Sequence, residues 1–140
     1  MSITFEKVLV LKNVSIFEKA SEMALADLIG VSEEKSFKEK EIILSEGQIN
    51  KFLYIIVSGR VQLKQDKTIL SDLEARQFFG ETTVLNPLPF PCDVIAVERT
   101  NVLRIPSDQL YQMLSLHPSL AQGFLGELSK RLHQEQFKNK

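Results

Sequence analysis

The spacing of apolar residues changes twice along this chain, and the change limits the folds open to it. Between about residues 32 and 106 the apolar residues come in short runs that glycines or charged turns separate. In one of these runs Val61 and Leu63 alternate with polar residues, as a half-buried strand requires. Residues 65–67 are a predicted hairpin turn. Many short strands with helical patterns on both sides favour an antiparallel barrel or sandwich with helices packed outside it.

Helical spacing is found before and after the strand-rich region. "SEMALADLIG" predicts a short helix that Gly30 closes as a cap. A second helix is predicted to begin with Ser107 as its N-cap and to break at His117-Pro118. The last helix is predicted from Ser119 to about Phe137. It carries an apolar stripe of Leu120, Phe124, Leu125, Leu128 and Leu132.

Composition indicates one globular domain without a strong electric field. The chain has 140 residues, of which 44% are apolar and 25% charged, and its formal charge is −1. No basic surface for nucleic acid or an anionic membrane is therefore indicated. The longest apolar run, Phe52 to Val57, is far shorter than the roughly 18 residues of a membrane span. The first twelve residues carry charges where a signal peptide needs an apolar block, so we expect a cytoplasmic protein.

The sequence offers no set of residues for catalysis or metal binding. The single cysteine, Cys92, excludes an internal disulfide, a four-thiolate iron–sulfur cluster and a cysteine zinc site. His117 and His133 lack a second ligand at metal spacing. No Ser/His/Asp set, carboxylate pair or phosphate-binding glycine loop of the Walker type is found, so we expect neither an enzyme nor a bound cofactor.

One long segment is free of positive charge. Residues 77–98, "QFFGETTVLNPLPFPCDVIAVE", contain no lysine or arginine, although Arg76 and Arg99 flank the segment on either side. The segment does contain Glu81, Asp93 and a further glutamate. A Gly-Glu turn therefore occurs without a cation close to it in sequence.

The order of the motifs carries a family resemblance. "EIILSEGQ", "FLYIIVSGRVQL", "FFGE", a proline-containing loop, "VIAVE" and "HPSLAQGFLGELSKRL" follow one another as in the cyclic nucleotide-binding domain family, which this chain resembles from about residue 13 to 132. The resemblance implies one domain over 1–140, mainly β, with an eight-stranded antiparallel β roll of the jelly-roll type. It divides into a helical segment 1–31, the roll 32–106 with a phosphate-binding cassette at 78–94, and two C-terminal helices in 107–140. Gly47, Gly59 and Gly80 would serve positive-φ turns of the roll.

The resemblance also assigns roles in the cassette. The glutamate after Gly80, here Glu81, would hold a ribose hydroxyl. Backbone N–H groups near Thr82 and Thr83, at the start of a one-turn helix, would hold a cyclic phosphate. The family places an arginine after the loop proline to grip that phosphate, whereas this chain has Phe90 there. Cys92 and Asp93 follow at positions where small or hydroxyl residues are usual in the family.

The missing arginine predicts weak or lost binding of cyclic AMP and cyclic GMP. Removing one partner of a buried charge pair costs about 2–5 kcal/mol, which is on the order of 30- to several-thousand-fold in affinity. Asp93 would add repulsion if it faces the phosphate. Arg60, Arg76 and Arg99 are the candidates to replace the lost cation. Two alternatives stay open: Phe90 either plugs the pocket or stacks on a base, and Glu81 either contacts a ligand or only complements a helix dipole.

Three functions are compatible with this pattern. The chain is a sensor that binds a small ligand and shifts its last helix, a β-roll scaffold that acts through self-association or an effector protein, or the sensing part of a transcription regulator. The last needs a helix-turn-helix, for which the sequence up to Lys140 leaves no room, so we do not expect direct DNA binding. We favour the scaffold. The last helix, with Gly123 and Gly126 beside its stripe, is the candidate homodimer contact, and packing within one chain is the alternative.

Overall fold

The computed structural model describes residues 4–138 of the chain. The elements follow in the order α1 (Thr4–Lys12), η1 (Ser15–Phe17), α2 (Glu22–Gly30), β1 (Glu33–Phe37), β2 (Ile42–Leu44), β3 (Phe52–Ser58), β4 (Arg60–Gln65), β5 (Thr68–Glu74), β6 (Phe78–Phe79), β7 (Asp93–Ala96), β8 (Thr100–Pro106), α3 (Ser107–Leu116) and α4 (Pro118–Phe137).

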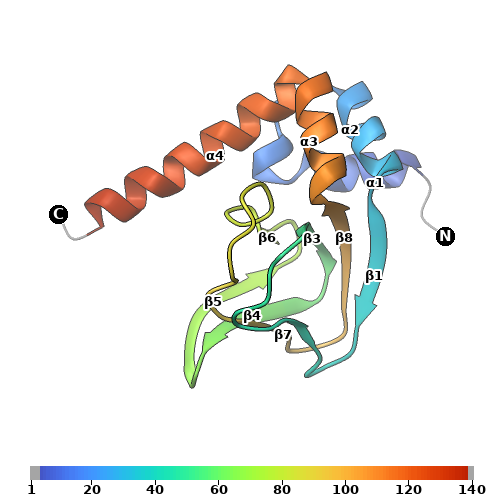
Figure 1. The fold of residues 1–140 in the computed structure, drawn as a ribbon. Coiled ribbons are helices and arrows are strands. Elements are labelled where there is room, and N and C mark those ends of the chain that lie inside the picture. Colours follow the sequence, from blue (N-terminus) through green and yellow to red (C-terminus); the bar gives the residue numbers. More distant parts are fainter. Residues whose placement is uncertain (1–3, 139–140) are drawn as a thin grey trace.

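The strands form two four-stranded sheets, in the orders β1-β8-β3-β6 and β2-β7-β4-β5. Every strand pair is antiparallel. Figure 1 shows the helices gathered at one end of the strands, with α4 projecting to one side beyond them. The predicted eight-stranded antiparallel β roll with flanking helices is confirmed.

Strand β3 explains why one stretch of the roll is apolar without alternation. Leu53 and Ile55 belong to the core that the helices share, whereas Tyr54 and Ile56 belong to the core between the two sheets. A strand buried on both faces has no solvent side, so its sequence is continuously apolar. The outer strand β5 is exposed along most of its length, which fits its place at the edge of its sheet.

Glycines occupy the turns that the sequence predicts. Gly47, Gly59 and Gly80 have φ of 87°, 95° and 91°. At Gly59 a Cβ atom would lie 2.4 Å from the carbonyl oxygen of Arg99, so both the backbone angle and the space require glycine. The predicted hairpin turn joins β4 to β5, and its Asp66 adopts φ of 55°.

Three local predictions differ from the structure. Gly30 is the last residue of α2 and is not among the positive-φ glycines, since Val31 is the C-cap. Ser107 is the first residue of α3, and the N-cap is Pro106, which makes no side-chain cap hydrogen bond. Proline fixes an extended entry into the helix without a hydroxyl. Helix α1 lies in the segment 1–31 that was expected to be helical, but it was not predicted as a separate helix, because no clear turn signals separate its five apolar residues.

Helix α4 begins at Pro118, after the predicted break, but only its first half is buried. Leu120 and Phe124 are each 1% exposed and Leu128 is partly buried, whereas Leu125 and Leu132 are 66% and 61% exposed. The predicted apolar stripe is therefore only half covered by the chain itself. No helix within residues 4–138 is long and apolar enough to cross a membrane.

Candidate functional site

The cassette begins with a tight turn after β6. Gly80 has φ of 91°, and the N–H groups of Thr83 and Val84 donate to its carbonyl oxygen at 3.2 and 3.0 Å. This is one hydrogen-bonded turn, and the secondary structure of residues 81–92 contains no helix in place of the expected one-turn helix. Because the Thr83 N–H already has an acceptor in the chain, it is not directed at a ligand.

Asn50 fixes this turn from the neighbouring loop. It is 1% exposed, and its Nδ2 donates to the carbonyl oxygens of Phe52 and Gly80 at 2.8 and 3.3 Å and to Oγ1 of Thr83 at 3.1 Å. Its Oδ1 accepts the N–H of Phe52. A Cβ at Gly80 would lie 2.7 Å from the Asn50 amide nitrogen, so the fit depends on glycine. Sequence reasoning missed Asn50, although a polar residue between two apolar runs is a weak signal of such an anchor.

The carboxylate of Glu81 is buried and already has a partner. Glu81 is 5% exposed, and its Oε2 lies 2.5 Å from Nη1 of Arg131 on α4. Nε of Arg131 donates to Oε2 of Glu127 at 3.0 Å. Burial raises the pKa of Glu81, and the Arg131 charge acts against that rise. The guanidinium also lies 5.4 Å from the ring centroid of Phe78.

Phe90 lies in the core between the two sheets. It is 5% exposed and belongs to the cluster that includes Tyr54 and Phe79. Its N–H donates to the carbonyl oxygen of Gln48 at 2.8 Å, and its own carbonyl accepts the N–H of Gly47 at 2.8 Å. The position at which the resemblance places a phosphate-binding arginine is thus occupied by a packed aromatic ring.

Cys92 and Asp93 hold the loop to the roll. Cys92 is 1% exposed, as expected of a small buried hydrophobe, and burial together with the Asp93 and Glu46 carboxylates raises the pKa of its thiol. Oδ1 of Asp93 accepts the N–H of Glu46 at 2.7 Å, which ties β7 to the loop before β3. Asp93 therefore has a hydrogen-bond partner in the chain.

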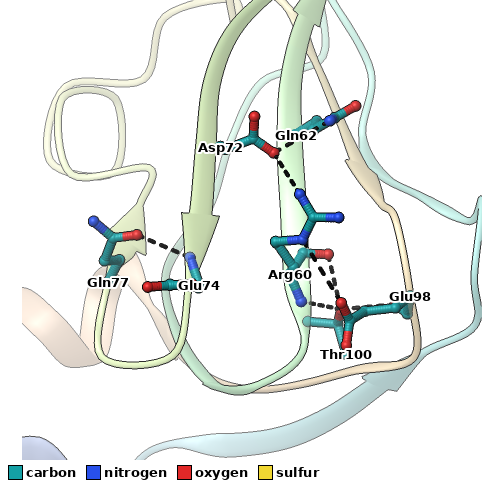
Figure 2. A network of polar contacts seen from close by, with 7 residues as sticks. All are labelled: Arg60, Gln62, Asp72, Glu74, Gln77, Glu98 and Thr100. Atoms are coloured by element: carbon teal, nitrogen blue, oxygen red, sulfur yellow. Dashed lines mark hydrogen bonds and ion pairs between the residues drawn. The ribbon is translucent and has the colours of Figure 1, made fainter.

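Arg60, one candidate for the missing cation, is engaged elsewhere. Its Nη1 lies 3.0 Å from Asp72 and its Nε lies 3.7 Å from Glu98, within the polar network of Figure 2. Arg76 lines a hollow with Arg60 and Glu98 at that same place. Among the described residues, the arginine that pairs with the cassette is Arg131, which sequence reasoning missed. A basic residue one helical turn from Glu127 and beside the apolar stripe was the available signal.

Thr82, next to Glu81, is exposed and faces a hollow beside α4. The hollow has a volume of about 680 Å³. Its lining consists of Thr82, Leu128, Arg131, Leu132, Gln134, Glu135 and Lys138. The structure thus brings Glu81 and Thr82 together with α4, whereas Phe90 and Cys92 face the core. No cluster of three or more potential metal ligands occurs within residues 4–138.

Comparison with known proteins places this geometry in context. The family model described as "Cyclic nucleotide-binding domain" matches residues 34–117. The chain is 23% identical over 128 residues to a "CRP-like cAMP-activated global transcriptional regulator" of Mycobacterium tuberculosis, with 88% of this chain and 57% of that protein covered. It is 28% identical over 108 residues to a "cAMP-dependent protein kinase regulatory subunit" of Dictyostelium discoideum, with 71% of this chain and 31% of that protein covered.

The fold agrees with solved structures. The sensor domain of the transcriptional regulator DNR from Pseudomonas aeruginosa superimposes with a TM-score of 0.82 at 23% identity, covering 96% of this chain and 94% of that one. The chain spans 57% or less of the length of the two regulatory proteins that it matches. The family model covers more than half of the chain, over the β roll and α3. The chain therefore belongs to the cyclic nucleotide-binding domain family.

Proposed function

We propose that this chain is a non-catalytic regulatory module that binds cyclic nucleotides weakly or not at all and acts through α4, by self-association or by contact with an effector protein. The observation that carries the proposal is the state of Glu81. Its carboxylate is 5% exposed and paired with Arg131, so the group expected to receive a ribose hydroxyl is occupied by the chain itself.

Phe90 supports the loss of phosphate binding. A phosphate needs a cation or several directed N–H groups in a site with little water. The ring of Phe90 is buried in the same core as Tyr54 and Phe79, two rings that stack with centroids 4.7 Å apart. An arginine at this position would have to leave that core to reach a phosphate. The Phe90 side chain supplies no charge in its place.

Helix α4 supports association with a second protein. The helix exposes Leu125 in its first half at 66%, and Leu132 and Phe137 in its second half at 61% and 49%. Isolated exposed apolar residues are common, but three large ones on one projecting helix offer apolar area that a protein partner can bury. The relatives named above include a transcription regulator and a kinase regulatory subunit, proteins in which regulation is the named role. A second copy of the chain is the partner that we expect first.

Calorimetric titration with cyclic AMP and cyclic GMP tests the ligand part. At 1 mM nucleotide a micromolar site would stabilise the fold by about 4 kcal/mol, whereas a millimolar site would add only about 0.4 kcal/mol. We expect no measurable heat and a change in melting temperature of no more than about 1–2 °C. A shift of several degrees that Glu81→Ala abolishes would contradict the proposal.

A gain of binding provides the converse test. Phe90→Arg together with Asp93→Thr replaces both residues that depart from the family pattern, and Phe90→Leu is the control for loss of packing alone. We expect the double change to produce measurable affinity for cyclic AMP and the control to produce none. For self-association, sedimentation of the chain at high micromolar concentration should give a dimer mass that Leu132→Glu reduces to a monomer. A monomer at that concentration would remove the homodimer.

A working cyclic nucleotide sensor is the second candidate, and the cassette turn favours it. Gly80 keeps its positive φ, Glu81 follows it, and Asn50 donates to the carbonyl oxygen of Gly80. A ligand that displaces Arg131 from Glu81 would find this frame ready. The same titration decides between the two candidates, because micromolar affinity is expected only from the sensor.

A further inference from the structure

Helix α4 is attached to the β roll by two different kinds of contact. The first half is held by burial, since Leu120 and Phe124 lie in the core that the helices share. Gly123 lies so close to η1 that a Cβ there would be 2.3 Å from the carbonyl oxygen of Ile16. Beyond Leu128 the described apolar side chains of the helix are exposed. The second half of α4 therefore needs a contact other than apolar burial to hold it against the β roll.

The ion pair between Arg131 and Glu81 is that contact. Arg131 lies one turn beyond Glu127, and its guanidinium joins two carboxylates of different origin, Glu127 of α4 and Glu81 of the cassette. The Glu127 side chain is 15% exposed and that of Glu81 is 5% exposed, whereas Arg131 is 43% exposed. Two poorly hydrated carboxylates share one cation. If either carboxylate loses Arg131, it is left buried with no positive charge beside it, which is unfavourable.

We propose that Arg131 acts as an intramolecular ligand of the cassette: it occupies the Glu81 carboxylate and thereby fastens the second half of α4 to the β roll, and any partner that takes Glu81 from Arg131 releases this half of the helix. The inference depends on the proposed function, because it describes how the occupied cassette controls α4. Arg131 and Glu81 then have two arrangements. In one they are paired and the second half of α4 is attached to the β roll; in the other they are separated and this half of the helix is detached.

The chemistry favours the paired arrangement when no ligand is present. A guanidinium bound to a carboxylate forms charge-assisted hydrogen bonds, which are stronger than the bond from a neutral hydroxyl. Arg131 is also tethered, so its effective concentration at Glu81 exceeds that of a dilute solute. By linkage, whatever binds Glu81 loosens α4, and whatever binds the second half of α4 away from the roll exposes Glu81 to the same extent.

Hydrogen–deuterium exchange of the amides in 126–137 measures the attachment directly. Glu81→Gln and Arg131→Gln are compared with the double variant and with the control Lys130→Gln, an exposed residue that borders the hollow beside η1 instead of the cassette. We expect about two- to tenfold faster exchange in each single variant. The double variant should exchange no faster than Arg131→Gln alone, and the control should match the parent chain.

Glu81→Gln separates attachment from helix stability, because it leaves the Glu127–Arg131 pair within α4 intact. Unchanged exchange in this variant, or additive effects in the double variant, would overturn the proposal. All variants are compared at one oligomeric state, verified by mass, so that a partner helix does not mask the effect. No nucleotide is needed: micromolar cyclic AMP binding in the titration would overturn the proposed function and leave this result standing.

Discussion

Gly123 and Gly126 are two glycines of one helix for which the structure predicts opposite effects of the same substitution. A Cβ added at Gly123 would lie 2.3 Å from the carbonyl oxygen of Ile16 and 3.4 Å from its carbonyl carbon. A Cβ added at Gly126 would meet nothing within 4 Å. Both residues lie inside α4, so alanine improves the helix propensity at both by about 1 kcal/mol.

The magnitude at Gly123 follows from the size of the clash. A contact of 2.3 Å with a backbone oxygen is not relieved by rotating a side chain, so α4 and η1 have to move apart. Overpacking of this kind costs about 1–3 kcal/mol, occasionally more. After the gain in propensity of about 1 kcal/mol, Gly123→Ala should lower the free energy of unfolding by up to about 2 kcal/mol. Gly126→Ala should raise it by about 0.5–1 kcal/mol.

Urea unfolding followed by circular dichroism measures both variants. The midpoint should fall for Gly123→Ala and rise for Gly126→Ala, with the same dependence on urea concentration in each case. Two stabilised variants would refute the close approach of α4 to η1. Loss of a dimer in Gly123→Ala without loss of stability would instead assign this glycine to an interface between two copies, which was the role first expected for it.

Three further predictions concern the cassette. Asn50→Ala removes an amide that serves three acceptors at the turn, and it should cost about 2–4 kcal/mol of unfolding free energy in urea, since buried groups are left without partners; a cost under about 0.5 kcal/mol would show that water replaces the amide. The Cys92 thiol, buried and with a raised pKa, should react with an aromatic disulfide reagent only in denaturant, and rapid reaction in the folded protein would be the contrary result. Burial raises the pKa of Glu81, so the folded state binds a proton at this residue more readily than the unfolded chain does. The stability that this adds is present below the unfolded pKa and is lost as pH rises through the folded pKa. Glu81→Gln should remove this pH dependence of the unfolding free energy, and an unchanged pH profile would contradict the prediction.

The β roll could be predicted because its signals are local. Turn glycines such as Gly59 and Gly80 are required by backbone angle, and short apolar runs between them leave few alternatives to antiparallel pairing. The burial of single residues was predicted less well from the sequence. The stripe on α4 suggested one continuous packed face, yet Leu132 is exposed whereas Phe124 is buried in the core that the helices share. Periodicity fixes which face is apolar but not how far along the helix a partner extends.

The candidate site was predictable in its outline and not in its charge balance. The segment 77–98 contains no cation, and the candidates outside it were Arg60, Arg76 and Arg99. Arg60 is committed to Asp72 and Glu98 on the outside of the roll. The cation that reaches Glu81 comes from α4, and only the three-dimensional path of that helix brings it there. Long-range ion pairs leave almost no trace in a single sequence, since many surface residues of a helix are charged.

Phe90 and Arg131 together explain how a cassette without its own cation remains folded. An arginine after the loop proline would place a positive charge near the buried turn, and a ligand phosphate would then be needed to balance it. With Phe90 in the core, no such ligand is needed on that side of the loop. Glu81 is then the remaining buried charge, and Arg131 of α4 compensates it. The effects of Phe90 and Arg131 on nucleotide binding are therefore coupled. An arginine at position 90 should restore useful affinity only when the nucleotide also displaces Arg131 from Glu81. Phe90→Arg combined with Arg131→Gln should therefore bind cyclic AMP more tightly than Phe90→Arg alone. Equal affinities in the two variants, measured by calorimetry, would show that the two positions act independently.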